Sequence, residues 1–122
     1  MDVLFHIVGR SDWRAAVARG EYRVESLGSE GFVHCSFAGQ VAGVANALYR
    51  DVDDICVVEI DPARLDARVL VEDSYAGGTA FPHVYGPIPA AAAVAVHDLT
   101  RGADGDYRFT VPGAADSASP DR

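Results

Sequence analysis

Short apolar runs separated by glycine, proline or charged residues recur along the chain, and most of them have the length of a β-strand. Residues 3–8 (VLFHIV) and 55–60 (ICVVEI) are rich in β-branched side chains and predict two strands. Similar runs at 31–36 and 67–73 predict two more. The polar stretch at 21–30 predicts a loop or a weak strand.

Helical spacing of apolar residues appears twice, each time directly after a predicted strand. The first helix is expected over residues 11–19, where Ser11 or Asp12 can cap its start and Gly20 can end it. Three apolar side chains of this segment recur one turn apart: Trp13, Ala16 and Val17. The first helix therefore has one apolar face with which to cover a sheet.

The second helix is expected over residues 37–50, with Ser36 as its cap. Four apolar side chains form a stripe along it: Val41, Val44, Ala45 and Leu48. Residues 61–65 (DPARL), after the strand at 55–60, predict a turn with Pro62 at a first helical position.

The second half of the chain predicts less regular structure. Residues 74–81 are glycine-rich and are expected to be mobile, and the three prolines of 82–89 (PHVYGPIP) predict an ordered but irregular loop. Residues 90–99 are long enough for a helix, but their valines and the flanking prolines favour a strand in the second half. Turn residues at 102–106 lead into a strand at 107–111, which predicts a hairpin.

This order of elements is typical of an α+β fold rather than a regular βαβ winding. The chain has 122 residues, of which 49% are hydrophobic, enough for one domain with a real core. We expect that domain to span residues 1–112. Residues 113–122 are Gly, Ala, Ser, Asp, Pro and Arg without periodicity, which predicts a disordered tail.

The charge balance makes general nucleic-acid binding unfavourable. The net charge is −8, and all ten basic residues are arginines. An acidic surface repels a phosphate backbone, so duplex nucleic acid is not an expected partner. A local arginine pocket could still hold one phosphate, because guanidinium binds phosphate with two hydrogen bonds.

The two cysteines and the hydropathy pattern favour a cytoplasmic protein. Cys35 and Cys56 both lie in apolar runs, so we interpret them as reduced and buried. Cys35 alternates away from His34 along a strand, which argues against a catalytic Cys–His pair. The sequence shows no signal-peptide pattern and no apolar stretch near the roughly 20 residues that span a bilayer. A membrane partner is therefore not expected.

No P-loop, dinucleotide fingerprint, HExxH or CxxC motif is present, so the sequence predicts no metal site. The candidate chemistry then rests on histidines. His6 and His34 lie on predicted strands beside helix starts, where each is either a packed core residue or part of a cleft. Alternation places His6 on the face opposite Phe5 and Ile7.

Two further histidines and one carboxylate complete the candidates. His83 lies in FPHVYG, where prolines can fix a loop around a ligand or simply make a structural turn. Glu72 ends the apolar run VLV within the predicted strand at 67–73 and faces either a pocket or water. His97 begins a polar run and is expected to be solvated.

These motifs together resemble the bacterial domain-of-unknown-function 952 family. The resemblance rests on FHI near the start, the helix with Trp13, SLGSEGFVHCS followed by Gln40, and FPHVYGPI. It covers residues 1–111. It implies a fold similar to the ADP-ribosyltransferase superfamily, most nearly the small RNA 2′-phosphotransferases, in which a split antiparallel or mixed β-sheet with two helices holds NAD.

The resemblance also implies roles for individual residues. His6 would hold the nicotinamide ribose, His34 and Ser36 would stand against the nicotinamide, and Glu72 would stabilise the oxocarbenium-like centre. Arginines surround a phosphate in the phosphotransferases, and three are plausible in this chain: Arg10, Arg23 and Arg64. The expected cleft is lined by seven residues: His6, His34, Ser36, Gln40, Glu72, His83 and Tyr85. Of these, Ser36, Gln40 and Tyr85 are expected to bind the cofactor and the other four to be catalytic.

Three classes of function remain open. The first is a small cytosolic enzyme with NAD as its substrate, which transfers ADP-ribose or cleaves the nicotinamide bond with electrostatic help from Glu72. The second is a non-catalytic module that binds an anionic small molecule. The third is an enzyme of other chemistry that uses His34 and His83 as an acid–base pair. All three need a small-molecule ligand, and the sequence does not indicate the oligomeric state.

Overall fold

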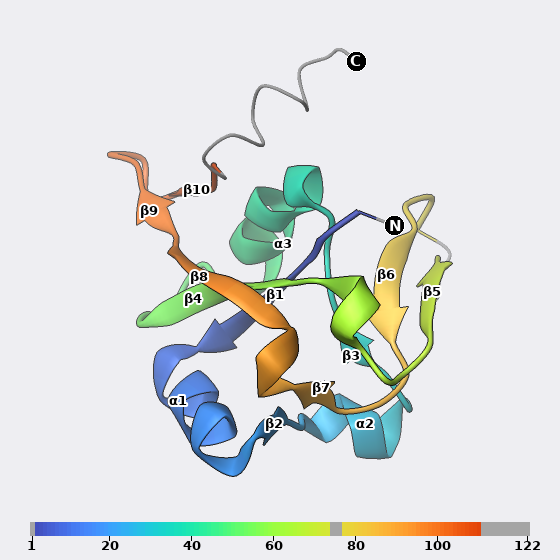
Figure 1. Ribbon diagram of the computed structural model, residues 1–122. Helices are drawn as coiled ribbons and strands as arrows, with labels where there is room; N and C mark the ends of the chain where they lie inside the picture. Colours follow the sequence, from blue (N-terminus) through green and yellow to red (C-terminus); the bar gives the residue numbers. More distant parts are fainter. Residues whose placement is uncertain (1, 74–76, 111–122) are drawn as a thin grey trace.

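Three β-strands far apart in the sequence form the central sheet (Figure 1). The computed structural model describes residues 2–73 and 77–110. β1 (Leu4–Gly9) pairs with β4 (Ile55–Ile60), and β4 pairs with β8 (Ala93–Asp98), both in antiparallel fashion. β4 lies between two partner strands and is buried along nearly its whole length, which explains its unbroken apolar run. The strands predicted at 3–8, at 55–60 and in the second half of 90–99 are confirmed.

A second antiparallel sheet has the order β3-β6-β5. β6 (Phe81–Val84) is its central strand, between β3 (Val33–His34) and β5 (Val69–Glu72). The prediction of an irregular loop at 82–89 is therefore wrong for the first half of that segment. Pro82 is tolerated because its carbonyl accepts from the Cys35 N–H at 3.1 Å, just beyond the end of β3. Because proline has no N–H, one hydrogen bond between β6 and the end of β3 is missing, and it lies at the margin of the sheet.

The two sheets are joined by a single antiparallel bridge between Phe5 and Ser36. The Phe5 N–H donates to the Ser36 carbonyl at 2.8 Å, and the Ser36 N–H donates to the Phe5 carbonyl at 2.7 Å. In the described part of the chain, no other pairing connects β1 with β3. Beyond the bridge, the edge of β1 from Ile7 to Gly9 is open. The strand predicted at 31–36 thus exists, but it forms a ladder only over Val33–His34.

The first helix, α1 (Arg10–Arg19), follows β1 without a loop. Its N-cap is Gly9, without a side-chain cap, so the prediction that Ser11 or Asp12 caps it is wrong. The prediction for Gly20 is confirmed, because Gly20 adopts the left-handed conformation with φ of 94° and its N–H bonds to the last turn. A short helix that the sequence did not predict, α2 (Glu25–Ser29), follows β2 (Glu21–Tyr22).

The second predicted helix is shorter than expected. A 3₁₀ turn, η1 (Ala38–Gln40), leads into α3 (Val41–Leu48). Ser36 does not cap it, since its backbone is used in the bridge to Phe5. The Gln40 side chain takes that role instead, because its Oε1 accepts from the Phe37 N–H at 2.9 Å.

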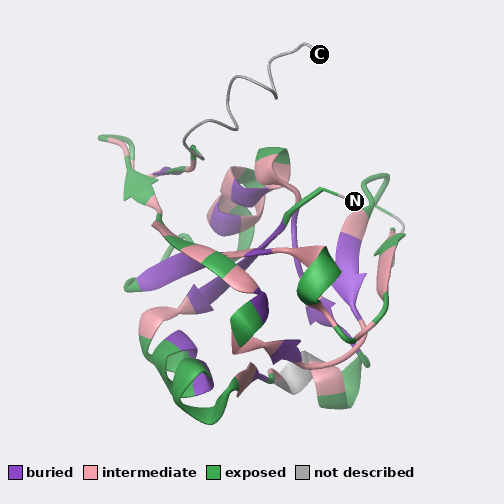
Figure 2. Ribbon diagram, in the orientation of Figure 1, coloured by how far each residue is buried: buried purple, intermediate pink, exposed green. Residues whose placement is uncertain are grey.

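β1 and β4 of the central sheet are buried on both faces, whereas β8 at its edge exposes residues such as Val94 and Val96 (Figure 2). Even-numbered residues of β1 face a core that contains Trp13 and Ala16 of α1, and odd-numbered residues face a core that contains Val41 and Ala45 of α3. His6 therefore lies opposite Phe5 and Ile7, as its place in the alternation predicted. The fold is α+β, with antiparallel sheets and few helices.

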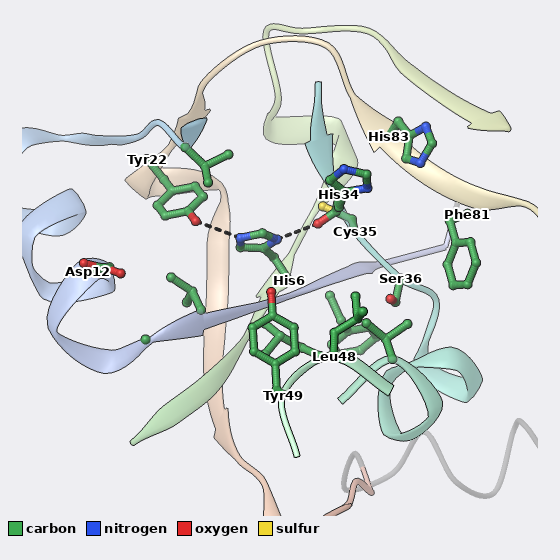
Figure 3. A pocket seen from close by; sticks show the side chains of 16 residues that line it. His6, Asp12, Tyr22, His34, Cys35, Ser36, Leu48, Tyr49, Phe81 and His83 are labelled. Atoms are coloured by element: carbon green, nitrogen blue, oxygen red, sulfur yellow. Dashed lines mark hydrogen bonds between the residues drawn. The ribbon is translucent and has the colours of Figure 1, made fainter. Parts of the chain in front are cut away.

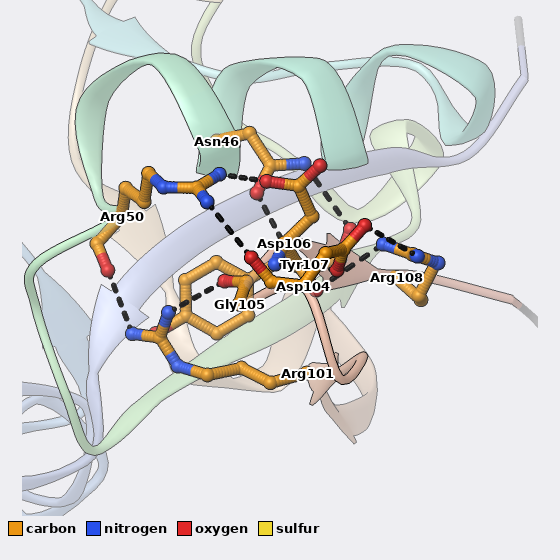
Figure 4. A network of polar contacts seen from close by, with 8 residues as sticks. All are labelled: Asn46, Arg50, Arg101, Asp104, Gly105, Asp106, Tyr107 and Arg108. Carbon is orange, nitrogen blue, oxygen red and sulfur yellow. Dashed lines mark hydrogen bonds and ion pairs between the residues drawn. The ribbon is translucent and has the colours of Figure 1, made fainter.

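The last described elements form the predicted hairpin, which is tied to the end of α3 (Figure 4). β9 (Thr100–Arg101) pairs with β10 (Tyr107–Arg108). Asn46 of α3 acts like a strand partner, since its side-chain amide bonds to both the N–H and the carbonyl of Tyr107 at 2.7 and 3.2 Å. Arg101 stacks 4.0 Å from the Tyr107 ring centroid and donates to the Arg50 carbonyl. Asn46 and Arg101 therefore anchor the hairpin to α3 and to Arg50, just beyond its end.

Smaller elements close the structure. β2 pairs with β7 (Ile88–Pro89), and the single turns η2 (Pro62–Arg64) and η3 (Ala90–Ala92) precede β5 and β8. Pro62 lies at the start of η2, as expected. The predicted tail at 113–122 and part of the predicted mobile segment, residues 74–76, lie outside the described residues. Across the described ranges, no helix has the length and apolar character needed to cross a membrane.

Candidate functional site

A pocket of about 750 Å³ opens along the free edge of β1, where β1 and β3 stop pairing (Figure 3). We call this place the split. Most of the lining side chains are apolar, which is typical of small-molecule sites. The walls come from β1 and α1 (Phe5–Gly9, Asp12), from β2 and the segment after it (Tyr22, Val24), from β3 and the two residues after it (His34, Cys35, Ser36), from α3 and the residue after it (Val44, Leu48, Tyr49) and from β6 (Phe81, His83).

The side chain of His6 holds the split open. Its Nδ1 lies 2.6 Å from the His34 carbonyl oxygen. In a continuous antiparallel ladder, the next pair after Phe5 and Ser36 would be Ile7 and His34. The His6 imidazole takes the His34 carbonyl instead, so the ladder cannot continue.

The hydrogen bonds of His6 fix its tautomer. A carbonyl oxygen only accepts, so Nδ1 carries the proton and donates to His34. Nε2 is then the acceptor and receives the Tyr22 hydroxyl proton at 2.9 Å. The ring is only 8% exposed, and burial lowers the pKa of His6 to about 4. His6 is therefore neutral at physiological pH and brings no positive charge to the pocket.

Ile7 presents its backbone to the pocket. The Phe5 N–H and carbonyl point away from β4 toward Ser36, while the N–H of Arg10 continues the ladder to Asp54 on the β4 side. Backbone direction alternates along a strand, so the N–H and carbonyl of Ile7 point to the same side as those of Phe5. The split therefore offers one donor and one acceptor side by side.

His34 and His83 lie directly opposite each other on β3 and β6. Their ring centroids are 5.3 Å apart and the rings are nearly perpendicular. His34 is partly exposed, and its Nε2 donates to Glu30 at 2.7 Å. His83 is 2% exposed and stacks on Phe32 with a centroid distance of 4.0 Å. The register of the second sheet thus brings two imidazoles to one wall of the pocket.

Glu72 orients His83. Its Oε1 accepts from His83 Nδ1 at 3.0 Å and from the Tyr85 hydroxyl at 2.5 Å. The hydrogen bond from Tyr85, followed by that from His83, lowers the pKa of Glu72 below its usual value, and the same bond raises the pKa of Tyr85. A carboxylate only accepts, so Nδ1 of His83 carries the proton. When Nδ1 holds the only ring proton, Nε2 has a lone pair, and it has no hydrogen-bond partner among the described residues.

The pocket gathers four of the seven residues expected to line one cleft: His6, His34, Ser36 and His83. Glu72 does not line it but contacts His83, and Tyr85 does not line it but bonds to Glu72. Gln40 also lies outside it and braces the fold, since its Nε2 donates to the Ala80 carbonyl at 2.9 Å.

The arginines proposed for phosphate binding do not line this pocket. Arg10 pairs with Asp54 and Asp98. Arg23 pairs with Glu21 at 2.6 Å, and Arg64 pairs with Asp61 at 3.5 Å.

The cysteines and His97 have structural environments. Both cysteines are free and buried, and burial raises the pKa of the Cys35 thiol to about 12, which keeps it protonated. His97 is not solvated as predicted, because its side chain is 18% exposed and its Nε2 lies 2.7 Å from Glu59. Glu59 lies on β4 two residues from Val57, the partner of His97, so the two side chains share one face of the sheet. Among the described residues, no three His, Cys, Asp or Glu side chains are grouped to hold a metal ion.

Three residues that line the pocket were not recognised as candidates from the sequence: Asp12, Tyr22 and Tyr49. Asp12 was considered only as a helix cap. Tyr22 lies in a polar segment whose pairing with β7 is not local. Tyr49 follows α3 directly, and in the sequence only its aromatic character sets it apart.

Comparison with known proteins supplies a family. The family model described as "Protein of unknown function (DUF952)" matches residues 7–96. The chain belongs to this family. The match begins one residue after His6 and includes His34, Glu72 and His83. Most residues that line the pocket therefore lie within the matched region. No curated protein matches the chain.

Solved structures of one other protein are similar in fold to this chain. The crystal structure of protein CC0527 from Caulobacter crescentus has 27% sequence identity and a TM-score of 0.77, covering 88% of this chain and 94% of that one. The solution NMR structure of CC0527 has 25% identity and a TM-score of 0.70, and it covers 98% of both chains. This chain and CC0527 are therefore alike over nearly their whole lengths.

Proposed function

We propose that the protein is an enzyme that moves a proton on a small molecule bound in the split, with His83 as the base. The observation that carries this proposal is the pair formed by Glu72 and His83. The Glu72 carboxylate fixes the proton of His83 on Nδ1. His83 lines the pocket, and its Nε2 has no hydrogen-bond partner among the described residues. An imidazole oriented by a carboxylate is a common arrangement for general bases.

The chemical step follows from this arrangement. Nε2 of His83 takes a proton from the substrate or from a water molecule, and the ring becomes an imidazolium. The nearby Glu72 carboxylate stabilises that charge, and stacking on Phe32 keeps the ring in place. His34, held by Glu30 at 2.7 Å, is the second proton-transfer group. Its ring lies 5.3 Å from that of His83, which suits a small substrate that contacts both.

The proposal can be tested without knowing the substrate. Wild-type protein is incubated with a bacterial small-molecule extract, and the extract is compared by mass spectrometry before and after. His83→Gln removes the base, whereas His97→Gln changes another glutamate-paired histidine, which is half-buried and does not line the pocket. We expect at least one compound to be consumed by wild type and by His97→Gln but not by His83→Gln. Equal consumption by all three proteins would contradict the proposal.

A second candidate is cleavage of the nicotinamide bond of NAD, and the backbone of Ile7 favours it. A primary carboxamide carries one acceptor and donors side by side, which complements the N–H and carbonyl that Ile7 offers. The resemblance to ADP-ribosyltransferases supports the same substrate. Two features weigh against it, since no arginine lines the pocket to hold a pyrophosphate and Glu72 contacts His83 instead of the pocket.

Calorimetry with NAD and chromatography of released nicotinamide distinguish the two candidates. If the protein cleaves NAD, the Glu72 carboxylate stabilises the positive charge at the breaking bond, which is typically worth about 3–4 kcal/mol. Glu72→Gln should then keep NAD affinity within a few-fold and nearly abolish nicotinamide release. If wild type neither binds NAD at millimolar concentration nor releases nicotinamide, the second candidate is excluded and the first is unaffected.

A further inference from the structure

We infer that one end of the pocket binds a positively charged nitrogen of the ligand, such as a protonated amine. We call this end the tyrosine end and define it by Asp12, Tyr22 and Tyr49. The inference deepens the proposed function, on which it rests, because it names the charge class of the molecule that His83 acts on.

Three separate elements supply the tyrosine end. Asp12 comes from the first turn of α1, Tyr22 from β2 and Tyr49 from the residue after α3. Figure 3 shows the three side chains around the imidazole of His6. The negative charges of Tyr49 and Asp12 both contribute, after burial, to raising the pKa of Tyr22, so the three groups are close enough to interact.

Asp12 is a carboxylate without a cation. Most arginines of the described chain pair with other acidic residues, such as Asp54, Asp61 and Glu21. Asp12 makes no hydrogen bond or ion pair with any described residue, although it lines the pocket. A carboxylate at the mouth of an otherwise largely apolar pocket attracts a cation and repels an anion.

The two tyrosines add acceptors and aromatic faces. Tyr22 uses its proton on His6, so its oxygen retains lone pairs for a donor. Tyr49 is half-buried, and its hydroxyl has no hydrogen-bond partner among the described residues. Aromatic faces next to a carboxylate favour ammonium groups through cation–π attraction.

No positive charge at the tyrosine end opposes this preference. His6 is neutral because burial lowers its pKa to about 4, and no arginine lines the pocket. The net charge of the whole chain, −8, acts in the same direction. The ligand class is therefore an organic ammonium with an apolar body that lies along Val44 and Leu48, and phosphorylated molecules are disfavoured.

Three probes of similar shape test the charge preference: benzylamine, benzyl alcohol and benzoate. Binding is followed by NMR amide shifts of the full-length protein at neutral pH and low salt. We expect benzylamine to bind about five to ten times more tightly than benzyl alcohol, because an ion pair and a cation–π contact together change the affinity by about that much. It should also shift the amide signals of Asp12, Tyr22 and Tyr49. Benzoate should bind most weakly.

Matched variants locate the effect. Asp12→Asn should remove most of the preference for benzylamine and leave benzyl alcohol unchanged. Asp66→Asn removes the same charge from an exposed position outside the pocket and should change neither. Equal binding of benzoate and benzylamine, or equal effects of the two variants, would overturn the inference.

The outcome is separable from that of the proposed function. Binding of benzylamine needs no turnover and should survive His83→Gln. If benzylamine shows no preference while a compound is still consumed in a His83-dependent way, only the charge inference fails. If benzylamine binds as expected and no consumption depends on His83, only the proposed function fails.

Discussion

The imidazole of His6 donates from Nδ1 to the backbone carbonyl of His34 across 2.6 Å, and this bond occupies the acceptor that Ile7 would need to continue the ladder. One side chain thus converts what would be a continuous sheet into two sheets with a pocket between them. The same bond explains why His6 is buried yet polar, since its two ring nitrogens are both satisfied.

Hydrogen exchange tests whether His6 keeps the strands apart. In wild type, the Ile7 amide should exchange at least about ten times faster than the amides of His6 and Val8, which point toward β4. In His6→Ala the His34 carbonyl is released, so the Ile7 amide should become protected. His6→Asn retains a donor near the Nδ1 position and should leave Ile7 unprotected. An Ile7 amide that is already protected in wild type would refute the role given to His6.

The lowered pKa of His6 predicts a loss of stability in mild acid. The ring has a pKa of about 4 when folded and an ordinary value of 6.5 when unfolded. Between these values the unfolded chain binds the extra proton, so the free energy of unfolding should fall as the pH drops from about 6.5 to 4, by about 3 kcal/mol in total.

Urea unfolding at several pH values measures this loss. His6→Asn does not titrate there, so its stability should decline less than that of wild type over the same window. Parallel pH profiles of the two proteins would show that His6 is not the group responsible. The contribution of Glu72 is separate, because its lowered pKa places its loss of stability below its ordinary value of 4.5.

Tyr22→Phe should destabilise the fold by about 1–3 kcal/mol. The substitution leaves Nε2 of His6 buried without its donor at 2.9 Å, and an unsatisfied buried acceptor costs about that much. Chemical denaturation gives the free energy of unfolding. Tyr49→Phe is the matched control, since its hydroxyl has no partner in the described structure and its loss should be nearly neutral. Equal effects of the two substitutions would argue against the His6–Tyr22 bond.

Tyr85→Phe should raise the pKa of Glu72. The Tyr85 hydroxyl is the first cause of the lowered value, and His83 is the second, so one of two stabilising bonds to the carboxylate is lost. A titration followed by the side-chain carboxyl carbon shift of Glu72 measures the midpoint. An unchanged midpoint would mean that Tyr85 does not hold Glu72 in solution.

Local patterns in the sequence were sufficient to predict the strands and helices that bury a continuous apolar face. β1, β4 and α1 follow from runs and helical spacing, and Gly20 marked the end of α1. β6 was missed because Pro82 and Pro87 disfavour a central strand. The strand is possible because Pro82 lies opposite Cys35, at the margin of β3. This pairing joins segments that are far apart in the sequence, so local patterns do not indicate it.

The candidate site shows the same division. His6, His34 and His83 were proposed from residue type and position, and the pocket brings them together. Their functions depend on partners that only the folded chain supplies, such as the His34 carbonyl for His6 and Glu72 for His83. Tyr49 and Asp12 gave no signal, because their shared pocket arises from the packing of α3 and α1 around the open edge of β1.

The most direct measurement of the central claim is the ring nitrogen spectrum of the histidines in wild-type protein. Long-range proton–nitrogen NMR at about pH 8.5, where imidazoles are neutral, identifies the protonated nitrogen of each ring. If Glu72 orients His83 as a base toward the pocket, His83 must be protonated on Nδ1 with a lone pair on Nε2. A His83 ring protonated on Nε2 would contradict the account, because the nitrogen in the pocket would then be a donor and could not accept a proton.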